Sequence, residues 1–349
     1  MRIFCFLWWC LACSLAIANS HQAASPEPQQ SATNFPTFVL PDWFKVSFLD
    51  LSEDNAEAAE ENKHLMVMFS QEFCPYCKAM IEKNLTQSSI RDQFDQHFDV
   101  VSLDIWGDRE VYGLDGDRTT EKEIARALDV QFTPTLIVFD DKGQSILRLN
   151  GYVSPNDMRV AMDFVSSRAY QTETIFDYLA KQRPAVRTPL NTQPFIASDD
   201  DLRTNGQITA ILFEQTECPD CDTFHRCVLS LPQVQAAFAP FHTVQLDIWS
   251  NQPITTPRGE QMTARQYAQQ MQIAYAPTLV LLDGEGEEVI RAESQLRNFH
   301  TEALLEFVSD AVYAREPNFQ RYIEERGDRI RAANNQVRIL GSRDVCPEL

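Results

Sequence analysis

The sequence predicts an α/β protein built from two tandem domains of the same kind, and three observations lead to this prediction. A Cys-Pro-X-Cys motif occurs twice, as Cys74–Cys77 and as Cys218–Cys221. Each motif follows an apolar run of strand type, Leu65–Phe69 or Ile208–Phe213, and precedes a helical pattern. Finally, the segments around the motifs match one another over most of their length.

The matching segments form an internal repeat with a long period. Phe69, Gln71 and Cys74 recur 144 positions later, whereas Pro134-Thr135-Leu136 recurs 143 positions later as Pro277-Thr278-Leu279. A single deletion reconciles the two offsets. A period of this length is too long for a solenoid and indicates a duplicated domain.

The expected elements follow in the same order in both copies. In the first copy, helical periodicity starts at Trp43 and continues through the acidic stretch that ends at Asn62. A capping box, Thr120-x-x-Glu123, opens a later helix, and Thr263-x-x-Gln266 is its counterpart. The other expected elements are a helix over 78–85, a strand over 100–105, a hairpin of 136–139 with 145–149, a helix over 155–167, and mostly helical chain over 156–182.

The N-terminus has the pattern of a secretory signal. Arg2 precedes an apolar run that ends at Ile17, and Ala16-Ile17-Ala18 offers a cleavage site. An uncleaved anchor and a lipoprotein site at Cys13 are the alternatives. We therefore expect a periplasmic protein with these segments: signal peptide 1–18, disordered leader 19–34, first domain 35–183, proline-containing linker 184–198, second domain 199–335 and tail 336–349.

Composition narrows the range of partners. The formal charge of −20 argues against nucleic acid and anionic membrane surfaces. The histidines are scattered without the spacing of metal ligands, so no metal and no dissociable cofactor is expected. In an exported chain, paired cysteines form disulfides more readily than zinc sites.

The Cys-Pro-X-Cys motifs indicate thiol–disulfide exchange. A cysteine at a helix start faces free N–H groups and the positive end of the helix dipole, which favour its thiolate. We expect Cys74 to be the nucleophile and Cys77 to resolve the mixed disulfide, with Cys218 and Cys221 in the same roles. Acidic residues at 217, 220 and 222 flank Cys218, so its thiolate should be the less stable of the two.

The motif and its following proline resemble the thioredoxin superfamily. That likeness implies a central mixed sheet flanked by helices, and a cis proline against each disulfide at Pro134 and Pro277. It also implies that Thr133 and Ala276 offer their backbone to a substrate. The buried aspartate of thioredoxins is replaced here by Met68 and Leu212. Glu72, with Tyr76 and Lys78, is the expected supporting group.

The first domain resembles SoxW-type periplasmic thioredoxins more closely, through Pro41–Lys45, Leu103–Val111 and Phe132–Thr135. The second domain is a more divergent copy. This likeness implies protein thiols and disulfides as partners, together with a membrane electron donor and sulfur-oxidation proteins. Reduction is the direction that we expect.

Two other interpretations stay open at this stage. The cysteine pairs could be inert structural disulfides of a binding module, or the four thiols could hold a metal ion across a domain interface. Cys227 is interpreted as a buried small hydrophobic residue. A bridge from Cys227 to Cys346 in the tail is its alternative.

Overall fold

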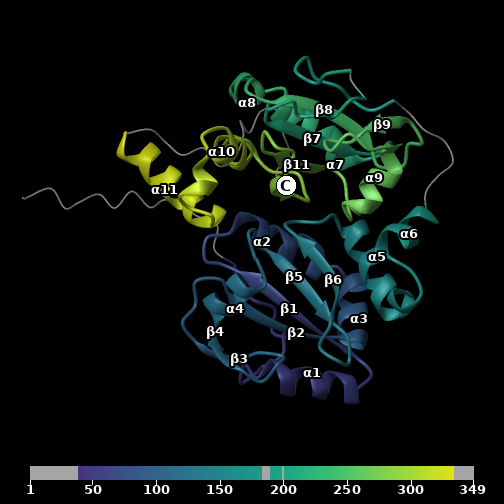
Figure 1. Ribbon diagram of the computed structural model, residues 1–349. Coiled ribbons are helices and arrows are strands. Elements are labelled where there is room, and N and C mark those ends of the chain that lie inside the picture. Colours follow the sequence, from purple (N-terminus) through teal and green to yellow (C-terminus); the bar gives the residue numbers. More distant parts are fainter. Residues whose placement is uncertain (1–37, 183–188, 199, 334–349) are drawn as a thin grey trace, which may run out of the picture. The chain divides into compact units, whose positions relative to one another are not determined.

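The computed structural model describes residues 38–182, 189–198 and 200–333 (Figure 1). The predicted signal peptide, leader and tail lie outside these residues, as does the start of the predicted linker. The described residues all belong to one compact unit. Within this unit the first copy of the repeat runs from purple to teal in Figure 1, and the second copy runs from green to yellow. We call them the first and second domain.

Each domain contains one four-stranded mixed sheet. The strand order is β2-β1-β5-β6 in the first domain and β12-β11-β7-β8 in the second. The motif-bearing strands β1 and β7 pair in parallel with β2 and β8, and every other pairing in these two sheets is antiparallel. The strands are β1 (His64–Ser70), β2 (Phe98–Asp104), β5 (Thr135–Phe139), β6 (Ser145–Asn150), β7 (Thr209–Glu214), β8 (His242–Asp247), β11 (Thr278–Leu282) and β12 (Glu288–Ala292).

A small hairpin accompanies each sheet. The hairpin of the first domain joins β3 (Glu110–Tyr112) to β4 (Arg118–Thr120), and that of the second joins β9 (Pro253–Thr255) to β10 (Gln261–Thr263). Both capping boxes are formed directly after these hairpins, so the prediction of a helix at each of them is confirmed.

Helices cover both faces of the sheets, and the burial of β1 shows this. All seven of its residues are buried. Met66 and Met68 pack in one apolar cluster, whereas Leu65, Val67 and Phe69 pack in another on the opposite face. A strand that is covered on both sides has a continuous apolar run instead of an alternating one, and this is the pattern of the sequence.

The helices of the two domains correspond to one another in order. Each motif helix continues into a π-helical turn, η1 or η3, and each domain ends in a long helix, a 3₁₀ turn and a further helix. The first domain has α1 (Leu51–Glu60), α2 (Pro75–Ala79), η1 (Met80–Leu85), α3 (Ser88–His97), α4 (Glu121–Ala127), α5 (Pro155–Ser166), η2 (Ala169–Gln171) and α6 (Ile175–Ala180). The second has α7 (Pro219–Phe224), η3 (His225–Leu229), α8 (Pro232–Phe238), α9 (Ala264–Gln270), α10 (Asn298–Ser309), η4 (Val312–Ala314) and α11 (Phe319–Ala332).

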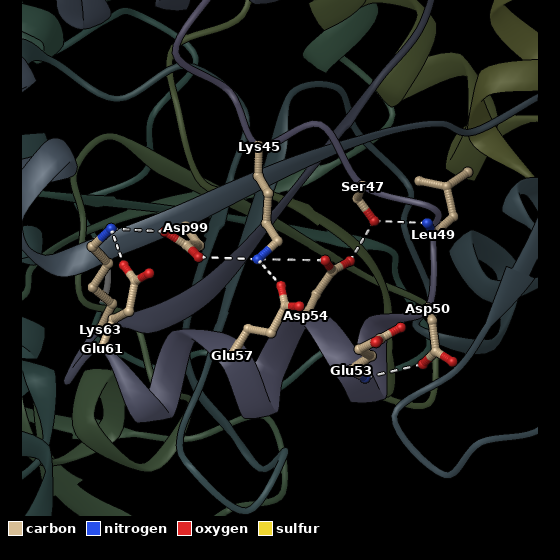
Figure 2. A network of polar contacts seen from close by, with 10 residues as sticks. All are labelled: Lys45, Ser47, Leu49, Asp50, Glu53, Asp54, Glu57, Glu61, Lys63 and Asp99. Carbon is tan, nitrogen blue, oxygen red and sulfur yellow. Dashed lines mark hydrogen bonds and ion pairs between the residues drawn. The ribbon is translucent and has the colours of Figure 1, made fainter.

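The chain before α1 is irregular, so the prediction of a helix from Trp43 is wrong for this part. The helix begins only at Leu51, where Asp50 caps it by accepting a hydrogen bond from the Glu53 N–H at 3.0 Å. Lys45 holds the preceding segment through ion pairs with Glu57 at 2.6 Å and Asp99 at 3.2 Å (Figure 2). Burial alone would lower the pKa of Lys45, but its carboxylate partners raise it. This network of ion pairs, and no helical hydrogen-bond pattern, holds the segment before Leu51 in place.

The prediction of two tandem α/β domains, each with a central mixed sheet, is confirmed. None of the helices in the described residues has the length and apolar character that a bilayer span requires.

Candidate functional site

Each Cys-Pro-X-Cys motif forms a disulfide at the start of a helix. Cys74 bonds to Cys77 and Cys218 bonds to Cys221, with Cα atoms 5.2 Å apart in both cases. The first cysteine of each pair is the N-cap, and its Sγ accepts a hydrogen bond from the N–H of the second cysteine at 3.0 Å. Proline at the first helical position needs no N–H partner, which suits this start. The local sequence thus places one sulfur of each pair at the positive end of its helix.

The loop before β5 lies against the first disulfide, and the loop before β11 lies against the second. The Thr133–Pro134 and Ala276–Pro277 peptide bonds are cis, as the resemblance implied. The Sγ of Cys74 is 3.4 Å from the carbonyl oxygen of Thr133, and the Sγ of Cys218 is 3.6 Å from that of Ala276. Both expected backbone positions are therefore next to the sulfur that we expect to be the nucleophile.

A glutamine and a tryptophan support this arrangement in both domains. The indole N–H of Trp106 donates to Gln71 Oε1 at 2.7 Å, and Gln71 in turn donates to Thr133 Oγ1 at 3.0 Å. In the second domain Trp249 donates to Gln215 at 3.0 Å. Trp249 lies in one apolar core cluster and Trp106 packs against the other, and the indole N–H groups of both also fix the glutamine next to the motif.

The three supporting residues expected in the first domain lie in different surroundings. Glu72 is exposed, so it does not take the place of the missing buried aspartate. Lys78 lies 3.6 Å from Glu82 in an ion pair on its helix. Tyr76 is buried, and burial raises the pKa of its hydroxyl to about 12. Of the three, only Tyr76 is built into the interior.

Sequence reasoning missed a buried acid–base pair in the second domain. Glu214 ends strand β7 and His225 begins η3, one turn after Cys221, and both are almost completely buried. The Nε2 of His225 is 2.9 Å from Glu214 Oε2, and Gln245 also donates to this carboxylate. The first domain has Ser70, Ile81 and Ser102 at these positions. The available signal was a glutamate at the end of an otherwise apolar strand.

Cys227 is buried as expected but is not a free thiol. It is disulfide-bonded. The interpretation of Cys227 as a simple small hydrophobic residue is therefore wrong. Among the described residues, no three His, Cys, Asp or Glu side chains are grouped as metal ligands.

The two domains contact one another through equivalent residues. Asn150 and Glu293, which are 143 positions apart, form a hydrogen bond of 2.7 Å. Gly151 and Ser294 have the same separation, and a Cβ atom on Gly151 would lie 2.4 Å from the Ser294 hydroxyl. When a residue contacts its own counterpart, the interface is isologous, as across a two-fold axis. The two repeated domains thus contact one another through an internal interface that resembles the interface of a symmetric dimer.

The third residue of each motif, between the proline and the second cysteine, lies in this interface. The hydroxyl of Tyr76 accepts a hydrogen bond from the Arg297 N–H at 2.9 Å and contacts His300 Nδ1 at 3.2 Å. The counterpart of Tyr76 is Asp220, and the counterpart of His300 is Asp157. One side of the interface thus pairs a phenol with an imidazole, whereas the other brings two carboxyl groups together.

The last helix of each domain lies next to the motif loops of the other domain. In α11, Gln320 accepts a hydrogen bond from Gln71 at 2.8 Å, and the ring of Phe319 is 5.4 Å from that of Phe132. In α6, the ring of Phe176, the counterpart of Phe319, is 4.6 Å from that of Trp249. Cys74 is 3% exposed and Cys218 is 5% exposed. Both nucleophile candidates are therefore covered in this arrangement.

The carboxyl group of Asp220 is expected to make folding pH-dependent. Burial and, to a smaller extent, the nearby Asp157 carboxylate raise its pKa to about 6, against an ordinary value of 3.8. Between these values the folded chain holds a proton that the unfolded chain has lost. The contribution of Asp220 to the free energy of unfolding is therefore fully present below about pH 4 and is lost as the pH rises through about 6.

Asp220→Asn should remove this dependence. We expect the free energy of unfolding at pH 8 to increase by about 1–2 kcal/mol, a value reduced for the screening of a partly exposed group. Urea unfolding at pH 5 and pH 8 measures it. Asp222→Asn, at an exposed position of the same helix, is the matched control, with an expected change below about 0.5 kcal/mol. An Asp220→Asn protein with the pH dependence of the unmodified chain would contradict this assignment.

Two regions of the chain match a known protein family. The profile of the thioredoxin-like domain family matches residues 51–166 and 197–309. A search of the curated proteins found no match. A thioredoxin-fold protein from Helicobacter pylori is 23% identical, with 35% of this chain and 80% of that chain covered and a TM-score of 0.30. A Thermus thermophilus thioredoxin is 26% identical, with coverage of 33% and 83% and a TM-score of 0.27.

A third similar structure is the oxidised C-terminal domain of DsbD from Neisseria meningitidis. It is 15% identical, with 34% of this chain and 91% of that chain covered and a TM-score of 0.25. The family assignment rests on the two profile matches, which together cover more than half of the chain. With both motif disulfides at helix starts and a cis proline against each, the chain belongs to the thioredoxin-like family and is a thioredoxin-like oxidoreductase with two active-site disulfides.

Proposed function

We propose that this protein reduces disulfides of other exported proteins in the periplasm, using both Cys-Pro-X-Cys sites. The observation that carries the proposal is the placement of Cys74 and Cys218 as helix N-caps, each beside the carbonyl oxygen before a cis proline. A thiolate in this position is stabilised, and a substrate backbone can pair with the adjacent loop once the helix of the other domain that covers it moves aside. The second cysteine of each pair then resolves the mixed disulfide.

The chemistry requires no dissociable cofactor. The thiolate of Cys74 attacks one sulfur of a substrate disulfide, and the other substrate sulfur leaves as a thiolate. Cys77 then attacks Cys74, releases the second substrate thiol and restores the protein disulfide. Two electrons pass to the substrate in each cycle. Cys218 and Cys221 perform the same steps in the second domain.

The finer assignment rests on sequence likeness. The first domain resembles SoxW-type periplasmic thioredoxins, which supports a membrane electron donor and sulfur-oxidation proteins as partners. The apolar N-terminal run with Ala16-Ile17-Ala18 supports export. A mature chain that begins at Asn19 in the periplasmic fraction is the outcome consistent with this location, and a full-length chain in the cytoplasmic fraction would exclude it.

Insulin reduction with dithiothreitol as the electron source tests the proposed activity. We expect the unmodified chain to accelerate the reaction and the Cys74→Ser/Cys218→Ser double variant to lose the acceleration, because no nucleophile is left. Each single variant should retain part of it. A double variant as active as the unmodified chain would favour the alternative, a binding module whose disulfides are inert.

A further inference from the structure

A cavity of about 280 Å³ opens beside Cys74. One wall carries Cys74, Phe132 and Thr133 of the first domain, and the opposite wall carries Phe299 and Ile323 of the second. Cys77 is completely buried and does not line the cavity. The sulfur that we expect to be the nucleophile is therefore the one that the cavity reaches.

The cavity is too confined for a protein segment. Its volume lies at the lower end of the range for small-molecule pockets. Helix α11 is fastened to the loop before the cis proline, because the Phe319 N–H donates to Gln131 Oε1 at 3.2 Å and Gln320 donates to the Gln131 carbonyl at 2.9 Å. An extended polypeptide cannot lie along this loop while these bonds persist.

The lining suits a small molecule that carries one positive and one negative charge. Its walls are largely apolar, and its charged members are Glu72, Glu324 and Arg331, all of which are exposed. Two carboxylates and a guanidinium at the exposed edge match the ammonium and carboxylate groups of a free amino acid. A cysteine derivative would present these groups outward and its sulfur inward.

A glycine in the middle of α11 leaves room for such a molecule. Gly327 is buried and lines the cavity, and a Cβ atom there would come closest to the end of the Arg331 side chain, at 3.3 Å. Glycine inside a helix costs about 1 kcal/mol relative to alanine. Helix propensity therefore favours a larger residue at this position, whereas glycine leaves the space between α11 and the cavity open.

We propose that this cavity binds one half of a low-molecular-weight cysteine disulfide and that the first site reduces it while α11 stays in place. The proposal rests on the proposed function, of which it names a substrate class. The Cys74 thiolate attacks the bound sulfur, forms the Cys74–cysteine bond and expels the other half as a thiolate. Cys77 attacks Cys74, expels the second cysteine and closes the disulfide. One disulfide is reduced to two thiols, and the protein dithiol is oxidised.

The test uses the full chain with Cys218→Ser/Cys221→Ser, so that of the two motifs only the first can react. The protein is reduced with dithiothreitol, freed from it and mixed with L-cystine, and the loss of the Cys74 and Cys77 thiols is followed over time by mass spectrometry of the alkylated peptides. Gly327→Leu should slow the reaction at least tenfold because it fills the cavity. Glu325→Leu, which places the same side chain on α11 outside the cavity lining, should react within twofold of the parent.

Two further measurements keep the test decisive. Cys77→Ser should trap a cysteine adduct at Cys74 after exposure to cystine, and this measurement depends on no change in α11. Phe319→Ala, which loosens α11, should raise insulin reduction at least fivefold and leave cystine reduction within threefold. Equal cystine rates for Gly327→Leu and its parent, or no adduct in Cys77→Ser, would overturn the proposal. A first site that reduces neither cystine nor insulin would instead contradict the proposed function.

Discussion

The second disulfide is expected to have a midpoint potential about 40 mV more negative than that of the first. Glu217, Asp220 and Asp222 surround Cys218, and Asp157 of the other domain adds a fourth carboxyl group to this side. Near Cys74 the third residue of the motif is Tyr76, whose hydroxyl stays neutral because burial raises its pKa to about 12. The electrostatic environments of the two sites therefore differ although their backbone geometry is the same.

The magnitude follows from the charges. A unit charge about 8 Å from a sulfur shifts the free energy of its thiolate by about 1 kcal/mol at an effective dielectric constant of about 40. Glu217 and Asp222 are exposed, so counterions reduce their contributions. A net effect of about 2 kcal/mol corresponds to about 40 mV for a two-electron couple. Since a less stable thiolate disfavours the reduced form, the second site should pass electrons to the first.

Glutathione titrations of the full chain measure this difference. Cys218→Ser/Cys221→Ser leaves the first site, and Cys74→Ser/Cys77→Ser leaves the second. Asp220→Asn in the latter protein should raise the midpoint by about 15–20 mV, since one of the charges is removed. Glu285→Gln, in the turn between β11 and β12, is the control and should leave it unchanged. Equal midpoints, or a more oxidising second site, would show that local charge does not set the order.

His225→Ile is expected to destabilise the chain by about 3–5 kcal/mol. The variant removes one partner of the Glu214–His225 pair and leaves a carboxylate that is 1% exposed. Gln245 still donates to that carboxylate, but a single amide does not replace the solvation that a buried charge has lost. The expected loss of stability is therefore that of leaving a buried charge unpaired. It exceeds the contribution of the hydrogen bond to the free energy of unfolding.

The first domain supplies the matched control, because it has serine and isoleucine where the second has Glu214 and His225. The double variant Glu214→Ser/His225→Ile should recover at least half of the loss, since no charge is left inside. Urea unfolding of the parent, the two single variants and the double variant completes the cycle. A double variant less stable than His225→Ile would show that the pair stabilises the domain by itself.

The sequence alone determined the two domains, the order of their elements and the four cysteines of the motifs. These features are local or repeated: apolar runs such as Leu65–Phe69, the capping boxes at Thr120 and Thr263, and proline after the first cysteine of each motif. Each acts through neighbours that are a few residues away. The irregular chain before Leu51 escaped prediction because its contacts, such as Lys45 with Asp99, are distant in the sequence.

Only the tertiary structure decided what surrounds the motifs. Glu214 and His225 are only 11 positions apart, but they lie on a strand and on a π-helical turn, and periodicity does not indicate which buried polar groups meet. The contacts of Asn150 with Glu293 and of Tyr76 with His300 join residues 143 and 224 positions apart. Such pairings depend on how whole domains pack, and a duplicated sequence predicts two similar faces without indicating that they meet. The cavity beside Cys74 exists because they do.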